Sequence, residues 1–339
     1  MKNKENPVSY LPPGLKKFEK RVIYSSFFLL LILILSYIPI FNHKDKAKSV
    51  ETAVLNPKHA QSVYEIDFYE NSSNKAKITL KKEGELWLIQ AEQFLLPAKQ
   101  EEVHRFLERI SRIQKFYKIS DSDKSLKKLN LLEKNNSDFY LTVKYREGND
   151  GIEKKSEVLF NFEKKSSGKV FARSLSNSSA FEIQDSKLIS CLTAQVSFWA
   201  ENSIVPQGIF SKNNSIQRIL LKKNALPSSY EKVITEKKDL SGLLSLTSGQ
   251  FFSDRDYLQN NKYKSIYSIK VEFGDASEII IEIIPYKVES YVLLYNFLPS
   301  PYINKKNAGS LKKINYAFTI SSWTLQNILS VFNENTGQS

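Results

Sequence analysis

The chain has 339 residues, of which 41% are hydrophobic and 25% are charged, and its formal net charge is +13. This composition excludes a chain that is disordered throughout, and the 11 glycines and 11 prolines exclude a collagen-like or low-complexity protein. The length is typical of about two domains.

The longest uncharged run covers residues 22–41 and contains "FFLLLILILSYIPIF". Twenty helical residues span the roughly 30 Å hydrocarbon layer of a bilayer. A cleavable signal normally has a shorter apolar region of about 7 to 15 residues, followed by small residues, whereas this run is followed by "NHKDKAKS". The run therefore predicts a transmembrane helix that stays in the mature protein as a signal-anchor.

Basic residues flanking this run predict its orientation. The positively charged residues before it are Lys2, Lys4, Lys16, Lys17, Lys20 and Arg21, and those after it are Lys44, Lys46, Lys48 and Lys58. The excess before the helix predicts that residues 1–21 form a cytoplasmic tail. The chain is then a single-pass protein of the inner (cytoplasmic) membrane, with its bulk in the periplasm or otherwise outside the cytoplasm.

Residues 42–61 are polar and predict a tether, and a first α+β domain is expected over residues 62–203. Its first residues alternate apolar and polar positions on both sides of an Asn/Ser turn, which is typical of a strand meander. Pro97 is expected to start an amphipathic helix with Val103, Phe106 and Ile110 on its apolar face. Strands are then predicted near residues 139–145, 158–162, 170–173 and 181–183. They are followed by a predicted helix that Asp185 or Ser186 caps and that has Leu188, Leu192 and Val196 on one apolar stripe.

The second half repeats this order after a linker over residues 204–215, so that a second α+β domain is expected over residues 216–335. The segment "FEIQDSKLISCL" resembles "FTISSWTLQNIL". The matching pairs are Phe181 with Phe318, Ile183 with Ile320, Leu188 with Leu325, and Leu192 with Leu329. The predicted fold class is therefore α+β, with one N-terminal transmembrane helix followed by two similar domains of antiparallel sheet with packed helices. An internal repeat explains this order, and so does the simple alternative that unrelated α+β domains share it.

Catalytic and metal-binding motifs are not found. The three histidines, His43, His59 and His104, lack partners at metal-ligand spacing. The segment "DSDKS" begins like a calcium loop but lacks the glycine and the glutamate that such a loop needs, which predicts a solvated turn. Cys191 lies in the apolar stretch "LISCLTAQV" and is expected to be buried. We predict no catalytic residue, cofactor or metal, and hence a protein that is not an enzyme.

Lysine pairs are scattered through both halves and do not gather in one segment, which argues against a nucleic-acid-binding surface. Attraction to anionic lipid headgroups or wall polymers is the alternative use of this charge.

The short basic N-terminus, the single apolar helix, "GELWLI", "FLLPAKQEEVHRFLERI" and "VFARSLSNSSAFEIQDSKLISCLTAQVSFW" together resemble a bacterial family of membrane-anchored proteins with a domain of unknown function. Genes of that family often lie beside subunits of gliding-motility-type ABC transporters. The resemblance covers most of residues 60–335 and brings no catalytic residues. It implies an extracytoplasmic accessory component of an ABC-type export or gliding-related complex, with an ABC permease as the partner.

Aromatic residues in "YVLLYNFLPSPY" are the candidate contacts for such a partner: Tyr291, Tyr295, Phe297 and Tyr302. The alternative is that this stretch is a core strand. Two other functions stay open at this point. One is a cell-division or wall-assembly scaffold, and the other is an anchored glycan hydrolase that uses Asp254, Asp256 or Glu272. The oligomeric state is left open.

Overall fold

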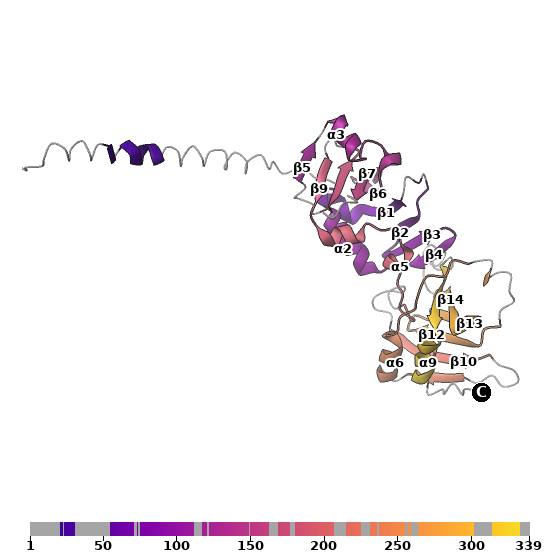
Figure 1. The fold of residues 1–339 in the computed structure, drawn as a ribbon. Coiled ribbons are helices and arrows are strands. Elements are labelled where there is room, and N and C mark those ends of the chain that lie inside the picture. The colour runs from indigo at the N-terminus through magenta and orange to yellow at the C-terminus, as the bar shows by residue number, and fades with distance from the viewer. Residues whose placement is uncertain are drawn as a thin grey trace, which may run out of the picture. The chain divides into compact units, whose positions relative to one another are not determined.

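A computed structural model describes residues 21–22, 24–30, 55–70, 73, 75–111, 117–120, 122–148, 150–162, 169–176, 180–206, 215–224, 231–235, 237–254, 257–258, 264–301 and 314–332 (Figure 1). The chain divides into two compact units, residues 1–51 and 52–339.

The described residues of the first unit, 21–22 and 24–30, are helical. Their large apolar side chains are exposed, and Tyr24 and Phe27 are examples. No helix within the described ranges is long and apolar enough to cross a membrane. Most of the predicted span over residues 22–41, the predicted tail before it and most of the predicted tether lie outside these ranges.

The second unit is a mostly antiparallel α+β structure, as the sequence predicts. Its described residues form one sheet of 15 strands in which every pair of neighbours is antiparallel. The strands are β1 (Val63–Glu70), β2 (Ile78–Glu83), β3 (Leu86–Ala91), β4 (Phe94–Pro97), β5 (Tyr117–Ser120), β6 (Phe139–Glu147), β7 (Ile152–Phe162), β8 (Val170–Ser174), β9 (Ala180–Ile183), β10 (Ile216–Lys223), β11 (Glu231–Ile234), β12 (Tyr267–Phe273), β13 (Glu278–Lys287), β14 (Ser290–Leu298) and β15 (Asn315–Ser321).

Short helices accompany this sheet. Among the described residues of this unit, the α-helices include α2 (Gln100–Ser111), α3 (Asp123–Lys128), α4 (Ser186–Cys191), α5 (Val196–Trp199), α6 (Lys237–Leu244) and α9 (Ser322–Val331), and the 3-10 helices include η1 (Pro57–Ser62) and η2 (Lys134–Asn136). Helix α2 contacts α4, and α6 contacts α9. Figure 1 shows α6 and α9 side by side.

Two runs of neighbouring strands in the sheet have the same order. The first is β2-β1-β6-β7-β8-β9 and the second is β11-β10-β12-β13-β14-β15. Each run begins with two paired strands in reverse chain order, β2-β1 in the first run and β11-β10 in the second. A four-strand meander follows, from β6 to β9 or from β12 to β15, and the chain then enters a helix, α4 or α9. The first run lies within residues 62–203 and the second within residues 216–335, both belong to the one sheet of the second unit, and β4 joins them where Asn315 pairs with Leu95. Strands β3 and β4 extend the first run at one edge, and β5 extends it at the other.

The strand-to-helix ends of the two runs are built alike. The eight residues matched in the sequence are all buried: Phe181, Ile183, Leu188, Leu192, Phe318, Ile320, Leu325 and Leu329. Each helix has a side-chain N-cap, which is Asp185 for α4 and Ser321 for α9. A capping oxygen satisfies backbone N–H groups that have no partner within the helix. The two caps differ by one position in the matched segments, because Asp185 corresponds to Ser322 and the cap of α9 is Ser321, the last residue of β15.

Three local predictions are wrong. Pro97 does not start a helix: it ends β4, and α2 begins three residues later at Gln100. Val196 does not continue the helix after Leu188, because α4 ends at Cys191 and Val196 opens α5. The segment "DSDKS" is not a plain turn, since it contains the start of α3, where the Ser122 side chain accepts a hydrogen bond from the Ser125 N–H.

Candidate functional site

Two of the predicted contact residues lie in the core. On β14, Tyr295 is fully buried and Phe297 is 4% exposed, while Tyr291 is half-buried. The ring of Tyr295 stacks on Tyr316 with centroids 4.5 Å apart. Side chains buried in this way do not reach an external partner, so Tyr295 and Phe297 are core residues and not contact residues. Tyr302 lies outside the described residues.

The two stacked tyrosines differ in their hydrogen bonds, which leads to a prediction. The Tyr295 hydroxyl donates to the Ile204 carbonyl at 3.1 Å, whereas the buried Tyr316 hydroxyl has no partner among the described residues. We expect Tyr295→Phe to lower the free energy of unfolding by about 1 kcal/mol, and Tyr316→Phe to raise it by about 1 kcal/mol. Chemical denaturation of the two variants tests this, and equal destabilisation by both would contradict it.

The acidic residues considered for glycan hydrolysis do not form a described pair. Asp254 is exposed and accepts a hydrogen bond from the Tyr257 N–H at 2.8 Å, and Asp256 lies outside the described residues. Glu272 pairs with Arg218 and Lys270, and the hydrogen bond from Arg218 lowers the pKa of Glu272. A general acid needs the opposite shift. Within the described ranges, no three His, Cys, Asp or Glu side chains lie together in a way that would hold a metal ion.

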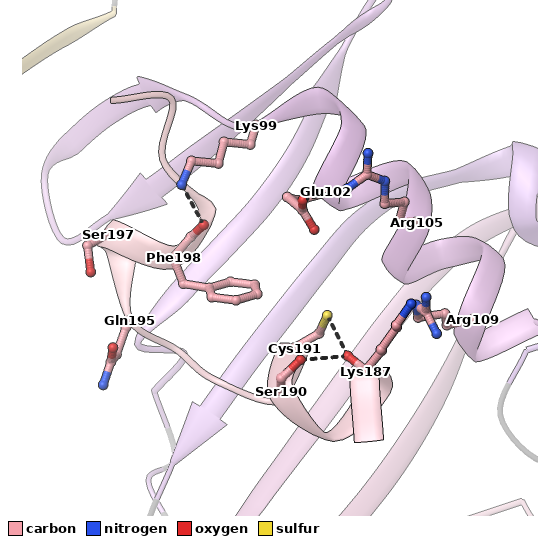
Figure 2. A pocket seen from close by; sticks show the side chains of 10 residues that line it. All are labelled: Lys99, Glu102, Arg105, Arg109, Lys187, Ser190, Cys191, Gln195, Ser197 and Phe198. Atoms are coloured by element: carbon pink, nitrogen blue, oxygen red, sulfur yellow. Dashed lines mark hydrogen bonds and ion pairs between the residues drawn. The ribbon is translucent and has the colours of Figure 1, made fainter. Parts of the chain in front are cut away.

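A pocket of about 790 Å³ lies beside α2, opposite the segment that contains α4 and α5 (Figure 2). We call it the basic pocket. Its lining residues are Lys99, Glu102, Arg105, Arg109, Lys187, Ser190, Cys191, Gln195, Ser197 and Phe198. Four of these ten side chains are cationic at neutral pH and one is anionic.

Helix α2 forms one wall of the basic pocket because its two faces differ. Val103, Phe106 and Ile110 are buried against the sheet, as their helical spacing predicts. Glu102, Arg105 and Arg109 each precede one of these residues, so they lie on the adjacent face of the helix, about 100° around its axis, and line the pocket. The Gln100 side chain fixes the start of the helix, since it accepts from the Trp87 N–H at 2.8 Å and donates to the Trp87 carbonyl at 3.0 Å.

The opposite wall is positioned by Asp185 and Trp199. The Asp185 carboxylate accepts from the backbone N–H groups of Lys187 and Leu188, which starts α4. It also accepts two hydrogen bonds from one Arg109 nitrogen, at 3.0 and 3.2 Å, and so ties α4 to α2. The fully buried Trp199 donates from Nε1 to the Thr193 carbonyl at 2.8 Å, which holds α5 beside the loop that follows α4.

The four cations of the basic pocket differ in how strongly they are engaged. Arg109 is held by Asp185. Arg105 pairs with Glu102 at 2.9 Å one helical turn away, and because the Arg105 side chain is 58% exposed and that of Glu102 33% exposed, this pair is weak. Lys99 Nζ lies 3.4 Å from the Phe198 carbonyl, which is a long hydrogen bond. The exposed Lys187 ammonium has no partner among the described residues.

Cys191 lies in this pocket as an uncharged group. Its Sγ donates to the Lys187 carbonyl at 3.1 Å, as Figure 2 shows, and burial raises the pKa of the thiol. The thiol is therefore protonated at neutral pH, which makes it a poor nucleophile and a poor metal ligand. The prediction of a buried Cys191 is confirmed. The chemistry that this pocket supports best is the binding of anionic groups.

The basic pocket could not be predicted from the lysine pairs of the sequence, because the pocket cations are single residues. One signal was present: Arg105 and Arg109 are four residues apart on a helix whose apolar face was already assigned. Lys187 joins the pocket only through contacts between segments that are distant in the sequence, so no local sequence pattern predicts its place there. The matching helix in the second half differs, because α9 contains no charged residue and Thr324 stands where α4 has Lys187.

No protein-family model matches this chain, and neither the curated proteins nor the solved structures compared with it include a match.

Proposed function

We propose that this chain is a membrane-anchored accessory protein, without catalytic activity of its own, that binds a partner outside the cytoplasm as part of an ABC-type export or gliding-related complex. Residues 22–41 serve as the anchor, because they are long and apolar enough to span a bilayer. The observation that carries the binding role is the basic pocket, which presents cationic side chains and a protonated thiol. Such a lining favours recognition of an anionic group over covalent chemistry.

We also propose that the two halves arose by duplication and have since diverged. The shared strand order, the helix pairs α2–α4 and α6–α9, and the eight matched buried residues support this. The halves differ at their last helix, because α4 carries Lys187 whereas the matching helix α9 contains no charged residue. In this proposal, the first half binds the partner and the second half supports the shared sheet.

Affinity purification of the full-length protein from mildly solubilised membranes tests this function. We expect mass spectrometry to recover an ABC permease with its ATPase. Recovery of cell-division or wall-synthesis proteins would instead favour a scaffold. A protein recovered without partners would contradict the proposed function.

A further inference from the structure

We infer that the basic pocket binds an acidic peptide segment of the partner protein, with carboxylates on its side chains and an apolar residue among them. This inference rests on the proposed function, because it names the chemistry of the partner at the site already described.

The spread of the cations along α2 indicates an extended ligand. Lys99 stands one residue before the helix and Arg105 lies six residues further along, which places their backbones about 9 Å apart along the axis, and Lys187 lies on the facing wall. An extended peptide of about three residues spans the distance between Lys99 and Arg105. A single compact anion such as inorganic phosphate would contact only one of these positions.

Three cations can change partner without loss of the fold. Lys99 makes only a long hydrogen bond, and Arg105 makes an ion pair in which its own side chain is exposed. Lys187 has no partner among the described residues. Arg109 differs, because it joins α2 to the N-terminus of α4 through Asp185. We therefore assign Lys99, Arg105 and Lys187 to ligand binding and Arg109 to positioning of the wall.

The uncharged lining favours a peptide over a uniformly charged polymer. Phe198 is half-buried and Cys191 is buried and protonated, so together they offer an apolar contact. Gln195, Ser190 and Ser197 are exposed polar side chains that can pair with peptide N–H and carbonyl groups. A polyanionic polymer would gain little from these contacts, whereas a peptide with mixed side chains uses both kinds.

Fluorescence anisotropy with the full-length, detergent-solubilised protein tests the inference. The probe is a fluorescein-labelled peptide of four glutamates around one phenylalanine, and the matched probe has glutamine at the same four positions. We expect the glutamate peptide to bind at least about tenfold more tightly, since it can form several ion pairs of modest strength. Its affinity should fall as the salt concentration rises.

The double variant Arg105→Gln/Lys187→Gln should weaken binding of the glutamate peptide about tenfold, because it removes two of the three ligand-binding cations. Phe198→Ala should weaken it about threefold. Lys128→Gln is the matched control, since it removes an exposed lysine from α3, outside the pocket, and binding should stay unchanged. Equal melting temperatures of the variants exclude a loss of folding as the cause.

Three outcomes overturn the inference: equal binding of both peptides, unchanged binding by the double variant, or displacement of the peptide by inorganic phosphate or an acidic polysaccharide at equal charge concentration. The proposed function is tested by a different experiment, so its failure can be told apart from failure of the inference. Peptide binding that follows our expectations, together with affinity purification that recovers no transporter subunit, would contradict the proposed function alone. Recovery of the transporter without peptide binding would contradict the inference alone.

Discussion

Trp199→Ala should lower the free energy of unfolding by about 3 to 5 kcal/mol, because it truncates a large side chain in the core. The indole is fully buried, and its ring centroid lies 5.1 Å from that of Phe68 and 5.3 Å from that of Phe106. Truncation leaves a cavity between α2 and the sheet, because the surrounding side chains relax only in part. It also removes the hydrogen bond to the Thr193 carbonyl, which then lacks this donor.

Trp323→Ala is the matched control for this substitution. Its side chain, at the start of α9, is 70% exposed, so its loss should change the free energy of unfolding by less than about 0.5 kcal/mol. Denaturation in guanidinium chloride, followed by circular dichroism on the full-length variants in detergent, measures both values. Similar midpoints for the two variants would contradict the packing role of Trp199.

The fold could be predicted in large part because its strands alternate. Along β12 buried and half-buried residues alternate without a break, so the alternation of apolar and polar residues in "YSIKVEF" predicts both the strand and its buried face. The two strand-to-helix ends were also readable, because a buried strand, a capping residue and a helical apolar stripe follow one another within a dozen residues. Each of these signals is local, and the contacts across the sheet then follow from the pairing of neighbours.

The elements that were missed or misplaced depend on contacts that are distant in the sequence. Pro97 lies in a strand because β4 pairs with β3 and because its carbonyl accepts from the Glu201 N–H at 2.9 Å. A proline at the first turn of a helix is common, so the local pattern favoured the wrong element. Helix α5 has four residues, which is too short for a helical period to appear.

The predicted aromatic contacts illustrate a second limit. The alternation in β14 separates two faces of the strand but does not say whether one or both are covered. In the structure Tyr295 packs on Tyr316 and Phe297 lies near the same ring. The basic pocket was missed for the opposite reason: its side chains come from two segments about 90 residues apart, and only folding brings them together.

Asp185→Ala should lower the free energy of unfolding by about 2 kcal/mol and should also disorder the wall of the basic pocket. The substitution removes the N-cap of α4, which costs about 1 kcal/mol. It also removes the carboxylate that pairs with Arg109, and loss of this partly exposed ion pair costs up to about 1 kcal/mol more. Helix α4 carries Lys187, Ser190 and Cys191 into the pocket, so a frayed α4 should weaken peptide binding although Asp185 does not line the pocket itself.

Asp185→Asn separates the two contributions. Asparagine caps a helix as well as aspartate does, but it carries no charge, so this variant should lose only the part due to Arg109, at most about 1 kcal/mol. It should also keep α4 and hence most of the peptide affinity. Denaturation and anisotropy on the two variants measure both effects. If Asp185→Asn were as unstable as Asp185→Ala, the ion pair would hold the wall and the cap would not, and Arg109→Gln should then reproduce the same loss.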